Sequence, residues 1–158
     1  MPAPIMNYSE TDIPLRPSPI FAFLKILPFA LCTLGLLFLA SRYVPDLIWP
    51  SLFSLAFGIY RYIFIRRVIY LVTTEYIRIT KGIFFKQVDT VEMFRVKDYV
   101  ITEPFLLQIF KLMDLHLKTT DPENPILWLR GIPQSDIVDI IRERVLDSRQ
   151  HNRIFEIN

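Results

Sequence analysis

The sequence is poor in residues that build covalent cross-links and metal sites. Its 158 residues contain one cysteine, Cys32, and two histidines, His116 and His151, which lie far apart. A single cysteine excludes an intramolecular disulfide and a zinc site built on cysteines, and the histidines lack the spacing of metal ligands. We therefore expect no disulfide, no bound metal and no cofactor.

Motifs of catalysis are also absent from the sequence. With only four glycines it has no Gly-rich phosphate loop, and it has neither HExxH nor GxSxG. His116 falls on the polar face of a predicted strand, and Asp121 and Glu123 fall in a predicted turn, so these side chains are expected to be solvated. The formal net charge of +2 does not indicate nucleic-acid binding. We predict a protein that is not an enzyme.

Apolar residues, in contrast, are abundant, at 52% of the chain with a mean hydropathy of +0.33. They form two long runs, 20–41 and 47–65, with a short polar connection between them. About 20 helical residues cross the roughly 30 Å of a bilayer's hydrocarbon. Trp49 near one end of the second run and Tyr60 near the other suit the aromatic belts of a membrane. The sequence predicts a transmembrane hairpin over 20–65.

These two runs have two other interpretations. A cleaved signal peptide is disfavoured, because no small-residue cleavage site follows the first run and a second apolar run comes at once. A re-entrant hairpin remains open, because the uncharged part of the second run, Leu47 to Tyr60, is short.

Basic residues orient the predicted hairpin. The connection between the runs carries only Arg42, whereas the opposite end carries Arg16, Lys25, Arg61, Arg66 and Arg67. Basic residues concentrate on the cytoplasmic side of membrane proteins. We therefore expect a multi-pass protein with both termini in the cytoplasm.

The remainder of the chain reads as a β-rich domain over 66–149, between a flexible, proline-punctuated tail at 1–19 and a loose tail at 150–158. Alternation and turn residues predict a short helix or bulky loop over 102–111 and an amphipathic helix over 134–149. The predicted strands are 68–73, 76–81, 83–88, 90–97, 113–119 and 126–130. An antiparallel sandwich or barrel capped by the last helix satisfies this α+β pattern.

Several of these segments resemble a known family. The motifs are Thr73-Thr74-Glu75-Tyr76 at a strand end, Gly82 in the next hairpin, Arg95-Val96-Lys97-Asp98, Leu106-Leu107 with Phe110, and Gly131-Ile132-Pro133. In this order they are similar to the membrane-tethered bacterial pleckstrin-homology-like (PH) domains, once catalogued as a domain of unknown function. The resemblance covers about residues 20–148.

The resemblance implies two transmembrane helices directly before a PH-like domain, in which two packed antiparallel sheets are capped by a C-terminal helix. It also implies a bacterial inner membrane location. One departure is that relatives usually have a glycine between the short helix and the next strand, where this chain has Leu112-Met113-Asp114. The fold is a binding scaffold, and fold alone does not determine function.

Two functions remain open. The favoured one is a scaffold or accessory subunit that binds other membrane proteins or a second copy of itself. It would use an apolar stripe, although such a stripe is more often core than docking surface: Phe105, Leu106, Ile109 and Phe110. The alternative is binding of anionic lipid headgroups. Its candidate residues are Lys25, Arg61, Arg66, Arg67, Lys81 and Lys86.

Overall fold

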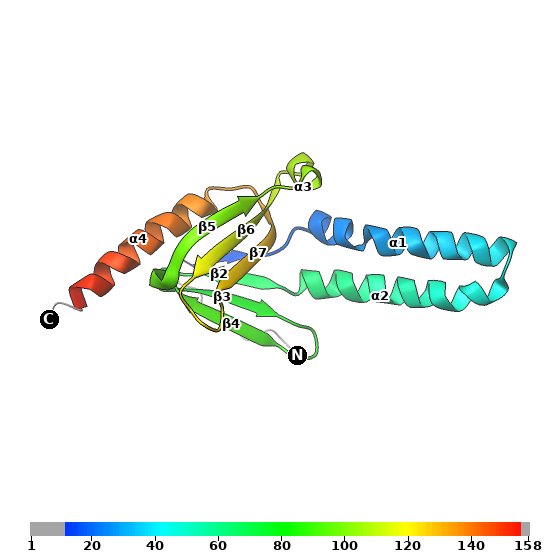
Figure 1. Cartoon of the computed structure of the whole chain (residues 1–158), viewed down its shortest axis with the longest axis horizontal. Coiled ribbons are helices and arrows are strands. Elements are labelled where there is room, and N and C mark those ends of the chain that lie inside the picture. Colours follow the sequence, from blue (N-terminus) through cyan, green and yellow to red (C-terminus); the bar gives the residue numbers. More distant parts are fainter. Residues whose placement is uncertain (1–11, 156–158) are drawn as a thin grey trace.

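The computed structural model describes residues 12–155 as a helical hairpin that projects from one end of a two-sheet domain (Figure 1). Helix α1 spans Pro19–Arg42 and α2 spans Ile48–Arg66, joined by a 3-10 turn at Pro45–Leu47. Ser18 caps α1, because its Oγ accepts a hydrogen bond from the Ile20 N–H at 3.3 Å. Pro28 lies inside α1 without ending it.

The two helices pack on each other but not into a core. Phe29 of α1 meets Phe57 of α2 edge-on with ring centroids 5.1 Å apart, and Ser54 Oγ donates a hydrogen bond to the Phe29 carbonyl oxygen at 3.2 Å. Only 17% of the residues in each apolar stretch are buried. By length and composition both helices could cross a membrane.

The domain consists of two antiparallel sheets. The first has the order β1-β2-β3-β4, with strands Ile13–Leu15, Ile69–Val72, Tyr76–Lys81 and Gln87–Glu92. The second has the order β5-β6-β7, with strands Val96–Thr102, Leu112–Thr119 and Ile126–Pro133. The short turn η2 (Met93–Arg95) connects the sheets, α3 (Phe105–Ile109) precedes β6, and α4 (Ile137–Phe155) ends the described chain.

The core lies between the sheets. Alternate residues of the strands, such as Ile77, Leu115 and Leu129, are completely buried, as the period of two along a strand requires. The amphipathic helix α4 adds Ile137 and Ile141 to the same cluster. The result is an α+β fold with two helices, antiparallel sheets and a C-terminal helix, as the resemblance implied.

Strand β1 corrects the prediction of a flexible tail over 1–19. It pairs with β2 in antiparallel register, with Ile13 opposite Val72 and Leu15 opposite Tyr70. Residues 1–11 lie outside the described part of the chain. The hairpin is therefore inserted between two paired strands, and both of its ends are attached to the domain.

Other boundaries also differ from the predictions. Residues 83–86 form the β3–β4 turn rather than a strand, and Gly82 at its start adopts φ +116°. Strand β7 continues through Pro133, and α4 reaches Phe155 rather than Arg149, so most of the predicted C-terminal tail is helical.

The departure from the family pattern before β6 also has a structural answer. Lys111 adopts φ +52°, a left-handed conformation that a glycine usually takes. Asp114 then accepts a hydrogen bond from the Gly131 N–H at 2.7 Å, where the register between β6 and β7 shifts. The turn before β6 thus has a left-handed residue, Lys111, without a glycine.

Candidate functional site

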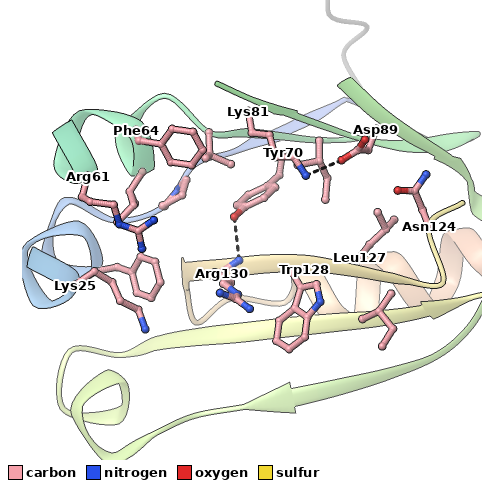
Figure 2. Close-up of a pocket in the computed structure, with 16 residues that line it drawn as sticks. Lys25, Arg61, Phe64, Tyr70, Lys81, Asp89, Asn124, Leu127, Trp128 and Arg130 are labelled. Carbon is pink, nitrogen blue, oxygen red and sulfur yellow. Dashed lines mark hydrogen bonds and ion pairs between the residues drawn. The ribbon is translucent and has the colours of Figure 1, made fainter. Parts of the chain in front are cut away.

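A cavity of about 350 Å³ lies where the base of the hairpin meets both sheets (Figure 2). This volume falls within the range of small-ligand sites, about 300–1,000 Å³. Residues from α1, α2, β2, β3, β4 and β7 line it. Residues that are distant in the sequence thus converge on one site.

The lining is positively charged, with four basic side chains, Lys25, Arg61, Lys81 and Arg130, and one acidic side chain, Asp89. Lys81 and Asp89 form an ion pair with 3.0 Å between Nζ and Oδ2. Within residues 12–155 the other three cations have no acidic partner in an ion pair. Uncompensated charge of one sign in a concave site attracts an anion.

Aromatic rings hold two of these cations. The Arg130 guanidinium lies 4.3 Å from the centroid of the Trp128 ring, and the Lys25 ammonium lies 5.3 Å from that of Phe21. Cation–π contacts of this kind favour a defined side-chain position. Trp128 also contacts His116, with ring centroids 3.7 Å apart. Burial, together with the charge of Arg130, lowers the pKa of His116 from its usual 6.5, although Asp114 opposes this shift.

Tyr70 connects the two sheets at the floor of the cavity. Its hydroxyl oxygen accepts a hydrogen bond from the Arg130 backbone N–H at 3.0 Å (Figure 2). Burial raises the pKa of Tyr70 above its ordinary value of 10.0, so its phenol stays protonated at neutral pH. The hydrogen bond to this hydroxyl therefore fixes β2 relative to β7. The hydroxyl itself remains protonated and can still donate a hydrogen bond.

Direct contacts attach the hairpin to the domain beside the cavity. The Ser18 N–H donates to the Gly131 carbonyl oxygen at 2.8 Å, and Arg66 Nη1 donates to the Pro17 carbonyl oxygen at 2.9 Å. Gly131 adopts φ +64°, and a Cβ at this position would overlap the ring of Phe21. A glycine is required here both for the backbone conformation and for this close approach. We call these contacts the hairpin–domain joint.

The predicted headgroup residues divide into two sets. Lys25, Arg61 and Lys81 line the cavity. Arg66 instead belongs to the hairpin–domain joint, and Arg67 and Lys86 are exposed residues outside the cavity lining.

Sequence reasoning missed Tyr70, Trp128 and Arg130. The sequence did contain a signal for Trp128 and Arg130, namely the alternation of residues along the predicted strand 126–130. Leu127 and Leu129 alternate as buried residues with Trp128 and Arg130, which places an aromatic ring and a guanidinium on the same outward face of β7. The contribution of β2 was not visible, because the cavity is made by packing between elements.

The apolar stripe was predicted to be core or a docking surface. Its members Phe105, Leu106, Ile109 and Phe110 are 75%, 53%, 56% and 42% exposed, so the core interpretation is wrong for these four. Leu107 is instead the buried residue of α3. Docking through the stripe stays a prediction.

No metal site is present among the described residues, since no three side chains of His, Cys, Asp or Glu gather there. A family model described as "Bacterial PH domain" matches residues 20–147, from the start of α1 into α4. No curated protein and no solved structure matches the chain.

Proposed function

The chain belongs to the bacterial PH domain family, and from this premise we propose that it is a membrane-anchored, non-catalytic binding module for anionic lipid headgroups. The observation that carries the proposal is the basic cavity at the base of the hairpin. Lys25, Arg61 and Arg130 are among its lining residues and have no acidic ion-pair partner among residues 12–155.

The anchor is proposed to be the pair α1 and α2. They contain 24 and 19 residues. At a rise of about 1.5 Å per residue α1 exceeds the roughly 30 Å of hydrocarbon, and α2 reaches that length only together with the turn Pro45–Leu47 before it. Their exposed apolar side chains suit a lipid environment. We propose a spanning rather than a re-entrant hairpin, in which the long Arg61 side chain extends from α2 toward the headgroups.

The proposed location is the bacterial inner membrane, with the domain and both termini on the cytoplasmic side. Lys25, Arg61 and Arg66 lie at the domain end of the helices and only Arg42 lies at the far end, which supports this orientation. The pairing of β1 with β2 supports placing the segments before and after the hairpin on one side of the bilayer.

The cavity would then lie at the level of lipid phosphates. Lys25 is in the second turn of α1 and Arg61 is near the end of α2 (Figure 2). In a spanning hairpin both side chains would therefore lie near the boundary between the hydrocarbon and the headgroups. Guanidinium groups of Arg61 and Arg130 can donate paired hydrogen bonds to phosphate oxygens, and the Lys25 ammonium can add a point charge. A phosphate-bearing headgroup satisfies the charge and the size of this site.

The test is native mass spectrometry of the delipidated full-length chain in detergent, with equimolar phosphatidylglycerol and phosphatidylcholine. We expect the wild type to retain phosphatidylglycerol at least tenfold more often, and the double variant Arg61→Gln/Arg130→Gln to lose this preference. Arg67→Gln is the matched control, because Arg67 is exposed and outside the cavity lining.

Equal retention of both lipids by the wild type, or an unchanged preference in the double variant, would contradict headgroup binding. Added glycerol phosphate shows whether the bound phosphate belongs to a lipid or to a soluble molecule. If it displaces phosphatidylglycerol stoichiometrically, the ligand is a soluble phosphate rather than a lipid.

A scaffold or accessory-subunit function is the second candidate, and an exposed sheet edge favours it. Among the described strands β5 pairs only with β6, and its residues Val100 and Ile101 are 39% and 44% exposed. Such an edge can accept a strand from another chain. A strictly monomeric mass, with no protein co-purifying from native membranes, would remove this candidate.

A further inference from the structure

Two groups of large apolar side chains outside the hairpin are exposed. Phe84 and Phe85 in the β3–β4 turn are 84% and 92% exposed. The second group is the stripe on α3, where Phe105 is 75% and Ile109 is 56% exposed. Contiguous exposed apolar groups of this size usually mark an interaction surface.

Both groups lie at the same end of the domain. In Figure 1, α3 and the β3–β4 turn are found at the end from which the hairpin projects, on opposite sides of the helices. Leu107 of α3 packs in one cluster with Phe21 and Ala22 of α1 and Ile65 of α2. Helix α3 is therefore fixed to the base of the apolar helices through Leu107, and its stripe lies on the exposed side of α3.

A basic residue follows each group. Lys86 comes directly after Phe85, and Lys111 comes directly after Phe110, and both lysines are exposed. An apolar tip next to a lysine suits the boundary between acyl chains and anionic headgroups, where the ring enters the apolar side and the ammonium stays among phosphates. This charge pattern favours a lipid surface over a second copy of the chain.

The local backbone holds both groups outward. The β3–β4 turn is closed at its base by the Lys81–Asp89 ion pair, and Gly82 at φ +116° allows the Phe85 carbonyl to approach closely. Helix α3 is held by buried Leu107, and Gln108 Nε2 donates to the Glu103 carbonyl oxygen at 3.0 Å. The exposed rings are therefore presented by folded structure.

We propose that α3 and the β3–β4 turn are two interfacial wedges, which insert their apolar side chains into the leaflet that the hairpin enters. They hold the domain against the bilayer on both sides of the hairpin, with the basic cavity between them. This inference rests on the membrane anchoring in the proposed function, but it does not require the cavity to bind a headgroup.

The test uses the full-length chain in liposomes, labelled with the environment-sensitive fluorophore NBD at one cysteine at a time. Native Cys32 on α1 is exposed and reports on the hairpin. In a Cys32→Ala background, Phe85→Cys and Ile109→Cys report on the wedges. Asp147→Cys is the control, because Asp147 is exposed on α4 at the opposite end of the domain.

Nitroxide lipids carry the quencher either near the headgroup or deep in the acyl chain. We expect the deep quencher to act best on a label at Cys32, and the shallow quencher to act best on labels at residues 85 and 109. Quenching there should exceed that at residue 147 by at least threefold. With Trp49→Phe added to each variant, Trp128 fluorescence checks that the domain is folded.

Three results would overturn the wedges. If labels at 85 and 109 behave like the label at 147 while Cys32 is quenched deeply, the hairpin is anchored but the wedges are not inserted. If they are shielded from water only at high protein-to-lipid ratio and escape lipid quenchers, a second copy covers them. If Cys32 also escapes quenching, the anchoring itself fails, and the proposed function fails with it.

Discussion

The hairpin and the two-sheet domain are both rich in apolar residues, but the domain buries them in its interior whereas the hairpin exposes them on its surface. In the domain, Leu115 and Leu129 are completely buried between the sheets. In α1, Leu34 and Phe38 are 64% and 67% exposed. The domain carries its own core, whereas the hairpin has an apolar exterior suited to lipid. The same residue type thus has a different energetic role in each region.

The difference also explains where the basic cavity lies. Within the core of the domain a charge would be costly to bury, and along the middle of the helices it would face hydrocarbon. At the junction of the two regions cations can remain partly solvated while a folded scaffold positions them. Lys25, Arg61 and Arg130 occupy this junction.

The largest expected difference in stability is between two Leu→Ala substitutions, one in the domain and one in the hairpin. Leu129→Ala should destabilise the domain by about 2–5 kcal/mol, because it removes a buried side chain and leaves a cavity. Leu34→Ala should change domain stability by less than about 0.5 kcal/mol, because its side chain is exposed. Urea unfolding in nanodiscs, followed by Trp128 fluorescence in a Trp49→Phe background, measures both. Equal effects would break the comparison.

The hairpin–domain joint is expected to be nearly as sensitive. Gly131→Ala forces an L side chain into a left-handed conformation, at about 1–2 kcal/mol, and overlaps Phe21, at about 1–3 kcal/mol. Phe21→Ala should cost less in the Gly131→Ala background than in the wild type, because removing the ring also removes the overlap. Gly35→Ala is the control, since nothing lies within 4 Å of its added Cβ. The same unfolding assay applies, and a neutral Gly131→Ala would show that the joint is loose.

The smallest effect distinguishes two adjacent arginines. Arg66→Gln removes the charged donor to the Pro17 carbonyl and should cost about 1.5 kcal/mol, near the low end for hydrogen bonds of charged groups because the residue is half-exposed. Arg67→Gln should have no measurable effect on unfolding, because Arg67 is exposed. If the two variants unfold alike, Arg66 has no positioning role at the joint.

Much of the fold could be predicted because its signals are local. Uninterrupted apolar runs marked the segments that became α1 and α2, and alternation marked residues 76–81, which form β3. The ordered motifs indicated the PH family, which the family match confirms. β1 was missed because a three-residue strand containing Pro14 has no periodicity of its own and exists only by pairing with β2.

The candidate site could be predicted only in part. Lys25 and Arg61 were found because each lies at the end of an apolar run, where charge stands out. Arg130 was missed because its role depends on Trp128 beneath it and on the hairpin opposite. Arg66 and Arg67 look equivalent in the sequence, but only Arg66 reaches Pro17, a contact that joins residues 49 positions apart.

Hydropathy and alternation are properties of neighbouring residues, so the chain alone decided that two long helices precede a β-rich domain with a C-terminal helix. The attachment of the hairpin through β1, the close approach of Phe21 to Gly131 and the convergence of cations on one cavity were decided only in three dimensions. Each depends on contacts between distant segments, whose distances and directions arise from packing.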